Sequence, residues 1–199
     1  MDGKELIAAI TGTLSLLVEH ADELRDLDAA LGDGDLGITV SSGSHAVIAA
    51  LAALGDDVTP AEVAKASAKA FANANPSTMA ALVAGALLAG SRSWASKTDI
   101  SQEDGVEFGL AAADSISQRG KSQLGDKTIL DAMIPAVEAL KSAENEADAL
   151  DAAIAAAQEG ARSTQELQSR RGRAAWLQER SIGLQDPGAI AFVRFMESW

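Results

Sequence analysis

The chain has 199 residues, of which 47% are hydrophobic and 23% charged, and its formal net charge is −13. This balance is typical of a globular protein and argues against disorder. The absence of cysteine excludes disulfides, thiolate nucleophiles and cysteine-based zinc sites. The negative charge argues against direct binding of nucleic acid or of anionic membrane surfaces.

The apolar residues are mainly alanine and leucine, and aromatic residues make up only 4% of the chain, with no tyrosine. Alanine and leucine favour helices, whereas strands favour β-branched and aromatic side chains. No stretch alternates with period two, and no linker divides the chain. We therefore predict an all-α fold in a single domain, 1–199. Since no basic segment followed by an apolar run opens the chain, we expect a cytoplasmic protein.

The first predicted helix follows an apolar series with steps of three and four from Leu6 to Leu27, and it runs to about Leu31. A second helix starts near Gly37 and ends before Gly55. The next is predicted to start at Thr59, with Thr59 as N-cap, Pro60 at the first helical position and a glutamate that completes a capping box.

Five further helices are expected along the rest of the chain. Two of them span residues 77–94 and 101–118, and a loop follows. Asp126 is predicted to cap the next helix, and a long alanine-rich helix covers residues 147–167. The short final helix opens at Asp186-Pro187-Gly188 and runs to the last residue.

Three aspartates lie at the predicted junction of the first two helices: Asp28, Asp33 and Asp35. Carboxylate oxygens are the ligands that Mg²⁺ and Ca²⁺ prefer, and three neighbouring carboxylates repel one another unless a cation neutralises them. The same turn could bind phosphate through the free amides of the following helix, at Gly37, Ile38 and Thr39. The spacing supports metal binding and simple helix capping about equally.

Two other interpretations of short motifs fail. The spacing and the final glutamate of an EF-hand are absent from the aspartate loop. Gly120-Lys121-Ser122 resembles the end of a phosphate-binding P-loop, but the first glycine of that motif is replaced by Ser115 and no strand precedes it.

Taken together, three motifs resemble the L subunit of dihydroxyacetone kinases and the nucleotide-binding domain of their single-chain relatives. The first is the aspartate loop, and the second is Gly125-Asp126-Lys127-Thr128-x-Leu130-Asp131-Ala132. The third runs from Gly172-Arg173-Ala174 through Glu179-Arg180-Ser181-Ile182-Gly183 to Asp186-Pro187-Gly188-Ala189. The motifs occur in the family's order, and the resemblance extends over nearly the whole chain.

The resemblance implies a barrel of about eight antiparallel amphipathic helices with the nucleotide, ADP or ATP, at one end. Asp28, Asp33 and Asp35 would hold two Mg²⁺, and Arg173 would act beside them in phosphoryl transfer. The nucleotide contacts of the family correspond to Leu36, Gly37, Ile38, Thr39, Ser77, Thr78, Gly120, Ile129, Arg173, Asp186, Pro187 and Gly188. One difference is the stretch Ala74-Asn75-Pro76-Ser77-Thr78, which replaces a glycine-rich loop.

The implied activity is that of a small-ketose kinase. The sugar, dihydroxyacetone or a related ketose, would be bound by a separate K-type subunit. The phosphoryl donor would be ATP or a phosphotransferase-system M subunit that rephosphorylates bound ADP. Two alternatives stay open: an ADP-loaded regulatory subunit that binds a transcription factor, and the nucleotide domain of a different kinase, such as a fatty-acid kinase.

Overall fold

The computed structural model of the chain describes residues 1–143 and 145–199, and these residues form helices and no strand. The all-α prediction is therefore confirmed. The α-helices are α1 (Gly3–Leu17), α2 (Ala21–Leu31), α3 (Leu36–Leu51), α4 (Pro60–Ala74), α5 (Thr78–Gly90), α6 (Gln102–Gly120), α7 (Leu130–Ser142), α8 (Glu146–Ser163) and α9 (Pro187–Ser198). Three 3₁₀ segments join them: η1 (Val18–His20), η2 (Thr164–Glu166) and η3 (Arg173–Ser181).

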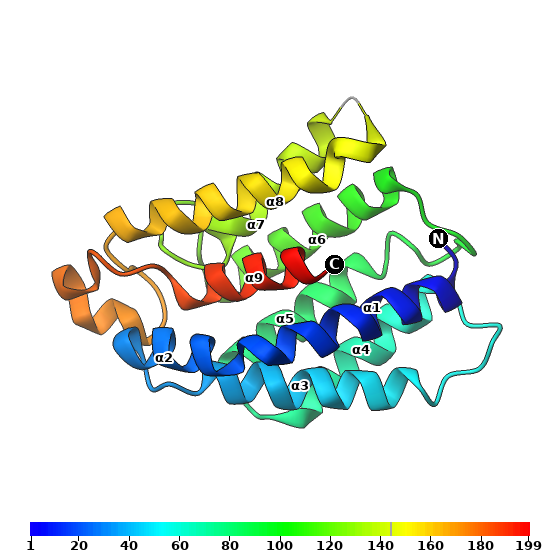
Figure 1. Cartoon of the computed structure of the whole chain (residues 1–199), viewed down its shortest axis with the longest axis horizontal. Helices are drawn as coiled ribbons and strands as arrows, with labels where there is room; N and C mark the ends of the chain where they lie inside the picture. Colours follow the sequence, from blue (N-terminus) through cyan, green and yellow to red (C-terminus); the bar gives the residue numbers. More distant parts are fainter. Residues whose placement is uncertain (144) are drawn as a thin grey trace.

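The helix starts follow local capping chemistry. Thr59 caps α4 through the predicted box with Glu62, Pro60 is the first residue of that helix, and Asp186 accepts the N–H of Ala189 at the start of α9. Each cap satisfies backbone N–H groups that have no partner inside the helix. The first predicted helix is divided by η1 into α1 and α2, which follow one another along the length of α3 (Figure 1).

One predicted cap was wrong. Asp126 does not cap a helix, because α7 begins only at Leu130, and Ile129, the residue before it, makes no side-chain capping bond. Lys127 has φ 62°, which turns the chain away from a helical path directly after Asp126. Asp131 instead accepts the N–H of Thr128 at 2.7 Å, and the carboxylate of Asp126 points to other partners.

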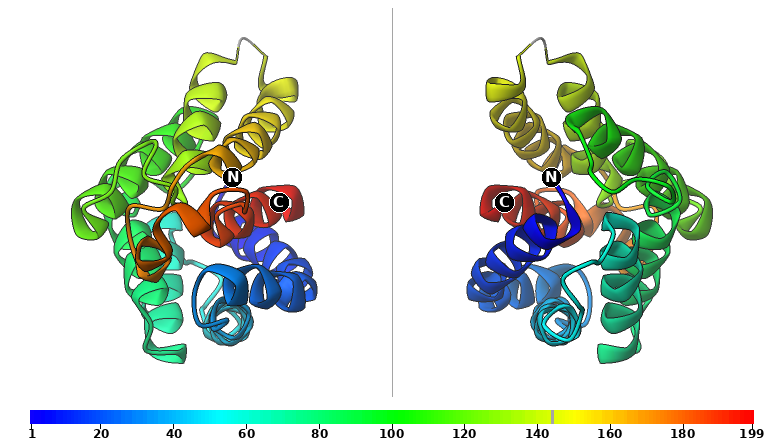
Figure 2. Two further views of the ribbon diagram at one scale, coloured as in Figure 1. Left: turned by 90° about the vertical axis from the view of Figure 1, so that its left-hand side faces the viewer. Right: turned by 90° about the vertical axis from the view of Figure 1, so that its right-hand side faces the viewer.

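The helices close into a ring. Successive pairs from α3 to α9 are in contact, and α9 returns to contact α1, which itself packs on α3. Figure 2 views this arrangement along the long axis. If α1 and α2 are counted as one interrupted helix, the described residues contain eight helices, the number expected for the barrel.

Small residues let the helices pack closely. The buried stripe of α8 consists of Ala149, Ala153, Ala157 and Ala161, spaced four apart. On the same helix, a Cβ added to Gly160 would lie 2.0 Å from the carbonyl oxygen of Asp131 in α7. Only glycine permits this separation between α7 and α8.

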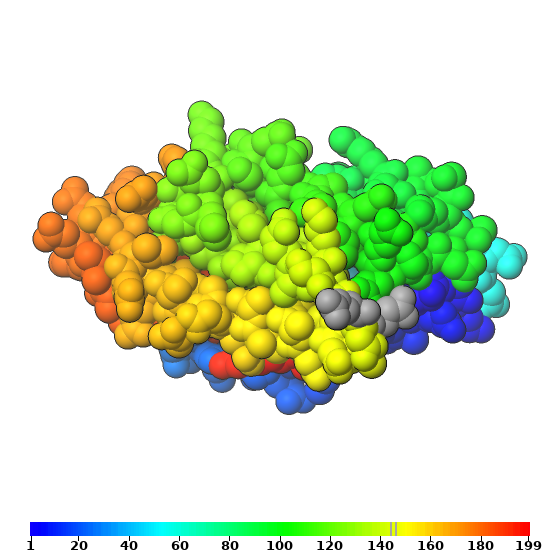
Figure 3. All heavy atoms as spheres, turned by 90° about the horizontal axis from the view of Figure 1, so that it is seen from above, coloured from blue at the N-terminus to red at the C-terminus, as the bar shows by residue number. Residues whose placement is uncertain are grey.

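The up-and-down order places the predicted site segments at one end of the barrel, here called the site end. There α2 ends and α3 begins, and α5, α7 and α9 also begin at this end (Figure 1). Figure 3 shows the residues around η3, in orange, at the outer tip of the same end. Among the described residues, no helix combines the length and the apolar character that a membrane crossing needs.

Candidate functional site

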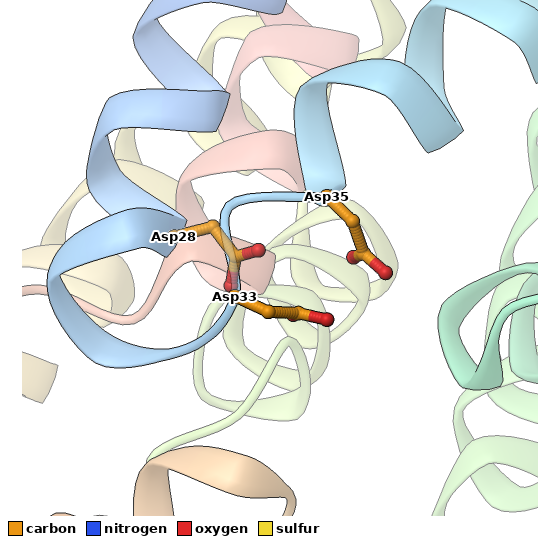
Figure 4. Close-up of side chains that lie close together, drawn as sticks. All are labelled: Asp28, Asp33 and Asp35. Carbon is orange, nitrogen blue, oxygen red and sulfur yellow. The ribbon is translucent and has the colours of Figure 1, made fainter.

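The three predicted aspartates converge at the site end. Asp28 lies in the last turn of α2, Asp33 in the loop that follows, and Asp35 directly before α3. One carboxylate oxygen from each lies within 4.8 Å of those of the other two. Figure 4 shows the three side chains pointing toward the same space.

Close packing of α3 on α2 brings these residues together. A Cβ on Gly37 would lie 2.1 Å from the carbonyl oxygen of Ala21, so only glycine fits this approach. Asp28 then reaches across the junction, and its Oδ2 accepts the N–H of Leu36 at 3.2 Å. The close approach of α2 and α3 therefore brings the three aspartates of this sequence motif together in space.

Helix capping accounts for only part of this cluster. Asp35 occupies the N-cap position of α3, yet its side chain makes no capping hydrogen bond. The single bond from Leu36 to Asp28 uses one carboxylate oxygen. The carboxylate oxygens not used for capping form a set of hard ligands of the kind that Mg²⁺ prefers. The donor chemistry therefore fits a divalent cation.

Arg173 reaches the cluster from η3, and its guanidinium contacts the carboxylate of Asp33. The predicted cation is therefore beside the predicted metal ligands. A hollow of about 450 Å³ borders Asp33 and Arg173. It is lined by Trp176 and Leu177 of η3 and by Ala29 and Ala30 of α2. Trp176 is 87% exposed and was not among the predicted site residues.

The starts of α3 and α5 lie side by side through their hydroxyl groups. The Thr39 hydroxyl lies 3.4 Å from the Ser77 hydroxyl, and Asn75 donates its side-chain N–H to Thr39 Oγ1 at 3.0 Å. Ser77 also caps α5 by accepting the N–H of Ala80. The predicted phosphate-binding turn at the start of α3 and the predicted nucleotide contact at Ser77 are therefore adjacent, and Asn75 of the divergent loop is part of their contact.

The first-turn amides of α3 differ in availability. The N–H of Leu36 donates to Asp28, and the N–H of Thr39 donates to the carbonyl of Asp35 at 2.9 Å. Thr39 thus offers its hydroxyl rather than its amide. The amides of Gly37 and Ile38 belong to the helix turn that has no partner within the helix.

The other predicted residues form two contact groups at the same end. Ile129 meets the turn before α9, since a Cβ on Gly188 would lie 3.6 Å from the Ile129 Cβ. In that turn Asp186 is buried, and burial raises the pKa of its carboxyl to about 7. Gly120, at the end of α6, faces Leu82 of α5.

Comparisons with known proteins agree with this architecture. The model of the DAK2 domain matches residues 30–199. The chain belongs to the DAK2 domain family. The motif-based resemblance to the L subunit of dihydroxyacetone kinases is thereby confirmed.

Two kinds of relatives differ in length. The chain is 28% identical over 198 residues to the PEP-dependent dihydroxyacetone kinase, ADP-binding subunit DhaL, of Escherichia coli, covering 97% of this chain and 93% of the relative. It is 32% identical over 181 residues to a Listeria innocua subunit of the same description, covering 88% and 83%. It is also 32% identical to the L-erythrulose 1-kinase of Mycolicibacterium smegmatis, but it spans only 35% of that protein.

The fold of this DAK2 family member matches a solved structure. The dihydroxyacetone kinase from C. freundii, crystallised with AMP-PNP and Mg²⁺, superimposes with a TM-score of 0.79 at 20% identity. The match covers the whole of this chain and 34% of the kinase chain. The all-helical fold is therefore shared with one part of a larger kinase.

The sequence patterns assign no role to Lys127, although its Gly-Asp-Lys-Thr motif carries part of the family resemblance. Its side chain is 1% exposed, and its ammonium group donates to carbonyl groups from distant parts of the chain. The only local signal for this role is the position of a lysine two residues after Gly125. Asn75 likewise has no predicted role beyond its place in the divergent loop.

Proposed function

We propose that this chain is the nucleotide-binding component of a small-ketose kinase and that 1–199 is a single domain of that kind. It holds ADP or ATP at the site end, while a K-type partner holds the sugar. Membership of the DAK2 family supports this assignment, and so do the relatives named as ADP-binding subunits, of which the chain spans most of the length.

In this proposal Asp28, Asp33 and Asp35 hold two Mg²⁺. The bound cations would neutralise phosphate charge and the charge that develops during phosphoryl transfer. The observation that carries the proposal is the convergence of the three carboxylates beside the start of α3. A cluster of negative charge at a phosphate site is compatible with nucleotide binding only if cations are bound there.

The remaining groups bind and orient. The free amides of Gly37 and Ile38 and the guanidinium of Arg173 supply fixed positive potential for phosphate oxygens. The hydroxyls of Thr39 and Ser77 are in position to accept or donate hydrogen bonds in the same region. Catalysis then rests on positioning and charge neutralisation, with no nucleophile from the chain.

The nucleoside end of the ligand is assigned to the other site-end groups. These residues are Gly120, Ile129, Asp186, Pro187 and Gly188, whereas Leu36 and Thr78 open α3 and α5 and are assigned to the phosphate end with Gly37, Ile38, Thr39 and Ser77. The contact between Ile129 and Gly188 supplies an apolar wall next to a tight turn, a surface on which a planar base can pack.

The phosphoryl donor is either free ATP or a phosphotransferase-system M subunit that rephosphorylates bound ADP. The relatives described as PEP-dependent support the second route. The acceptor is a small ketose of the dihydroxyacetone or erythrulose type, as the names of the relatives suggest.

Two measurements test this function. The first is titration of the chain with ADP. Binding is expected in the presence of Mg²⁺, and EDTA is expected to lower the affinity at least about tenfold, roughly 1.4 kcal/mol. The second combines the chain with a K-type partner and assays phosphate transfer from ATP, or from a phosphorylated M subunit, to dihydroxyacetone and erythrulose. Metal-independent ADP binding together with no transfer from either donor would refute the proposal.

A further inference from the structure

Lys127 has the largest of the fully buried side chains among the described residues, with 1% of its surface exposed. Lysine is rarely buried so completely. Its Nζ donates to the carbonyl oxygens of Leu167 at 3.1 Å, Ser181 at 2.6 Å and Leu184 at 2.5 Å. An ammonium group has three N–H donors, so all three are used.

The backbone at Lys127 gives no reason for a lysine. Its φ of 62° lies in the left-handed region, which costs an L-residue on the order of 1 kcal/mol relative to glycine. A glycine would make this turn with less strain. The reason for a lysine therefore lies in what its side chain binds.

The three acceptors belong to one stretch of chain, residues 167–184, here called the arginine segment. Leu167 opens it, and Ser181 and Leu184 lie at its far end, so one ammonium group joins both ends. The N–H of Ser169 donates to Ser181 Oγ at 2.9 Å and closes the base of the segment. Between these tied ends the segment carries Arg173 to the carboxylate of Asp33.

The residue before Lys127 strengthens this attachment. The backbone carbonyl of Asp126 accepts the N–H of Arg170 at 3.1 Å, and its carboxylate accepts Nε of Arg171 at 3.0 Å. The short turn before α7 therefore binds the arginine segment through both Asp126 and Lys127. Since this turn leads directly into α7, a helix of the barrel, these bonds fix the position of the segment relative to the barrel.

We propose that Lys127 is a positioning residue that ties both ends of the arginine segment and thereby holds Arg173 at the aspartate cluster. Its role in turnover rests on the proposed kinase function, whereas its role in holding the segment does not. Lys127→Met keeps the length of the side chain and removes all three donors. Lys127→Gly relieves the backbone strain and also removes the donors.

The first test is limited digestion of the full chain with trypsin, followed by mass spectrometry. The segment contains Arg170, Arg171, Arg173 and Arg180. Both variants are expected to be cut at these arginines at least about ten times faster than the wild type, since the segment opens without global unfolding. The rate at Lys65 in α4 serves as the internal reference and is expected to be unchanged.

Lys121→Met is the matched control, because Lys121 is an exposed lysine that also has a positive φ, 50°. It is expected to leave cutting within the segment at the wild-type rate. Wild-type cutting of folded Lys127→Met would overturn the proposal. If neither Lys127 variant folds, hydrogen exchange of the wild type decides. The amides of Ser169 and Gly183 should then exchange only with global unfolding, and early exchange would overturn it.

The second test separates positioning from general stability. With the kinase assay, Lys127→Met is expected to lower kcat about tenfold with a smaller change in the nucleotide KM. The double variant with Arg173→Ala should be no slower than Arg173→Ala alone, within about twofold, since the two residues act as a unit. If the double variant instead loses kcat by the product of the two single losses, the proposal is overturned. An inactive wild type would instead count against the kinase function and leave the trypsin result standing.

Discussion

The guanidinium of Arg173 contacts the carboxylate of Asp33, which joins η3 to the loop between α2 and α3. The two side chains are 66% and 42% exposed, and ion pairs this open to water stabilise a fold by about 1 kcal/mol or less. The contact therefore matters chiefly because it places a cation next to the proposed metal ligands.

Arg173→Ala should separate these two roles. We expect the melting temperature to change by no more than a few degrees, since the lost pair is worth about 1 kcal/mol or less. The rate of phosphoryl transfer should fall by roughly two orders of magnitude, because a phosphate-binding cation is lost. Thermal unfolding and steady-state kinetics measure the two effects. A large loss of stability with a normal rate would mean that Arg173 is structural.

Asp33→Asn should remove a metal ligand while keeping the size of the side chain. We expect Mg²⁺-dependent ADP affinity to fall at least about tenfold, roughly 1.4 kcal/mol, in calorimetric titrations. Asp56→Asn is the control, because Asp56 is an exposed aspartate that pairs with Lys4, far from the cluster. Equal ADP affinity in both variants would contradict the role of Asp33.

Gly160→Ala tests the close packing of α7 on α8. The added Cβ would lie 2.0 Å from the Asp131 carbonyl oxygen, and such overpacking costs about 1–3 kcal/mol of unfolding free energy. Gly12→Ala in α1 meets nothing within 4 Å and should stabilise the helix by about 0.5–1 kcal/mol. Urea unfolding of the two variants should therefore give shifts of opposite sign.

The pH dependence of stability should report the buried carboxyl of Asp186. Burial raises its pKa from 3.8 to about 7, so between these values the folded chain binds a proton that the unfolded chain has lost. The contribution of Asp186 to the free energy of unfolding therefore decreases as pH rises through this window, and it is lowest above pH 7. Asp186→Asn keeps a capping side chain and should gain about 1–3 kcal/mol relative to the wild type between pH 5 and 7. Urea unfolding at several pH values measures this, and parallel curves for the two proteins would contradict it.

Much of the fold could be read from local patterns. The capping box at Thr59 and the start of α9 at Asp186 depend on neighbouring residues, and both were predicted correctly. The aspartate cluster was predictable for the same reason, because its members share one short junction. Asp126 was assigned wrongly, since nothing local reveals the left-handed turn at Lys127.

Long-range contacts to the backbone were out of reach of pattern analysis. The partners of Lys127 are carbonyl groups, which every residue carries, so no residue type marks them in the sequence. The placement of Arg173 beside Asp33 was expected only through the family resemblance. Neither relationship could be derived from spacing, because each depends on how the arginine segment folds back over the site end.

The most direct measurement is a crystal structure of the chain grown with ADP and Mn²⁺, with anomalous scattering used to locate the metal. The account predicts anomalous peaks bound by the carboxylates of Asp28, Asp33 and Asp35 and by the ADP phosphates. Ordered ADP with no metal peak near these three side chains would contradict it.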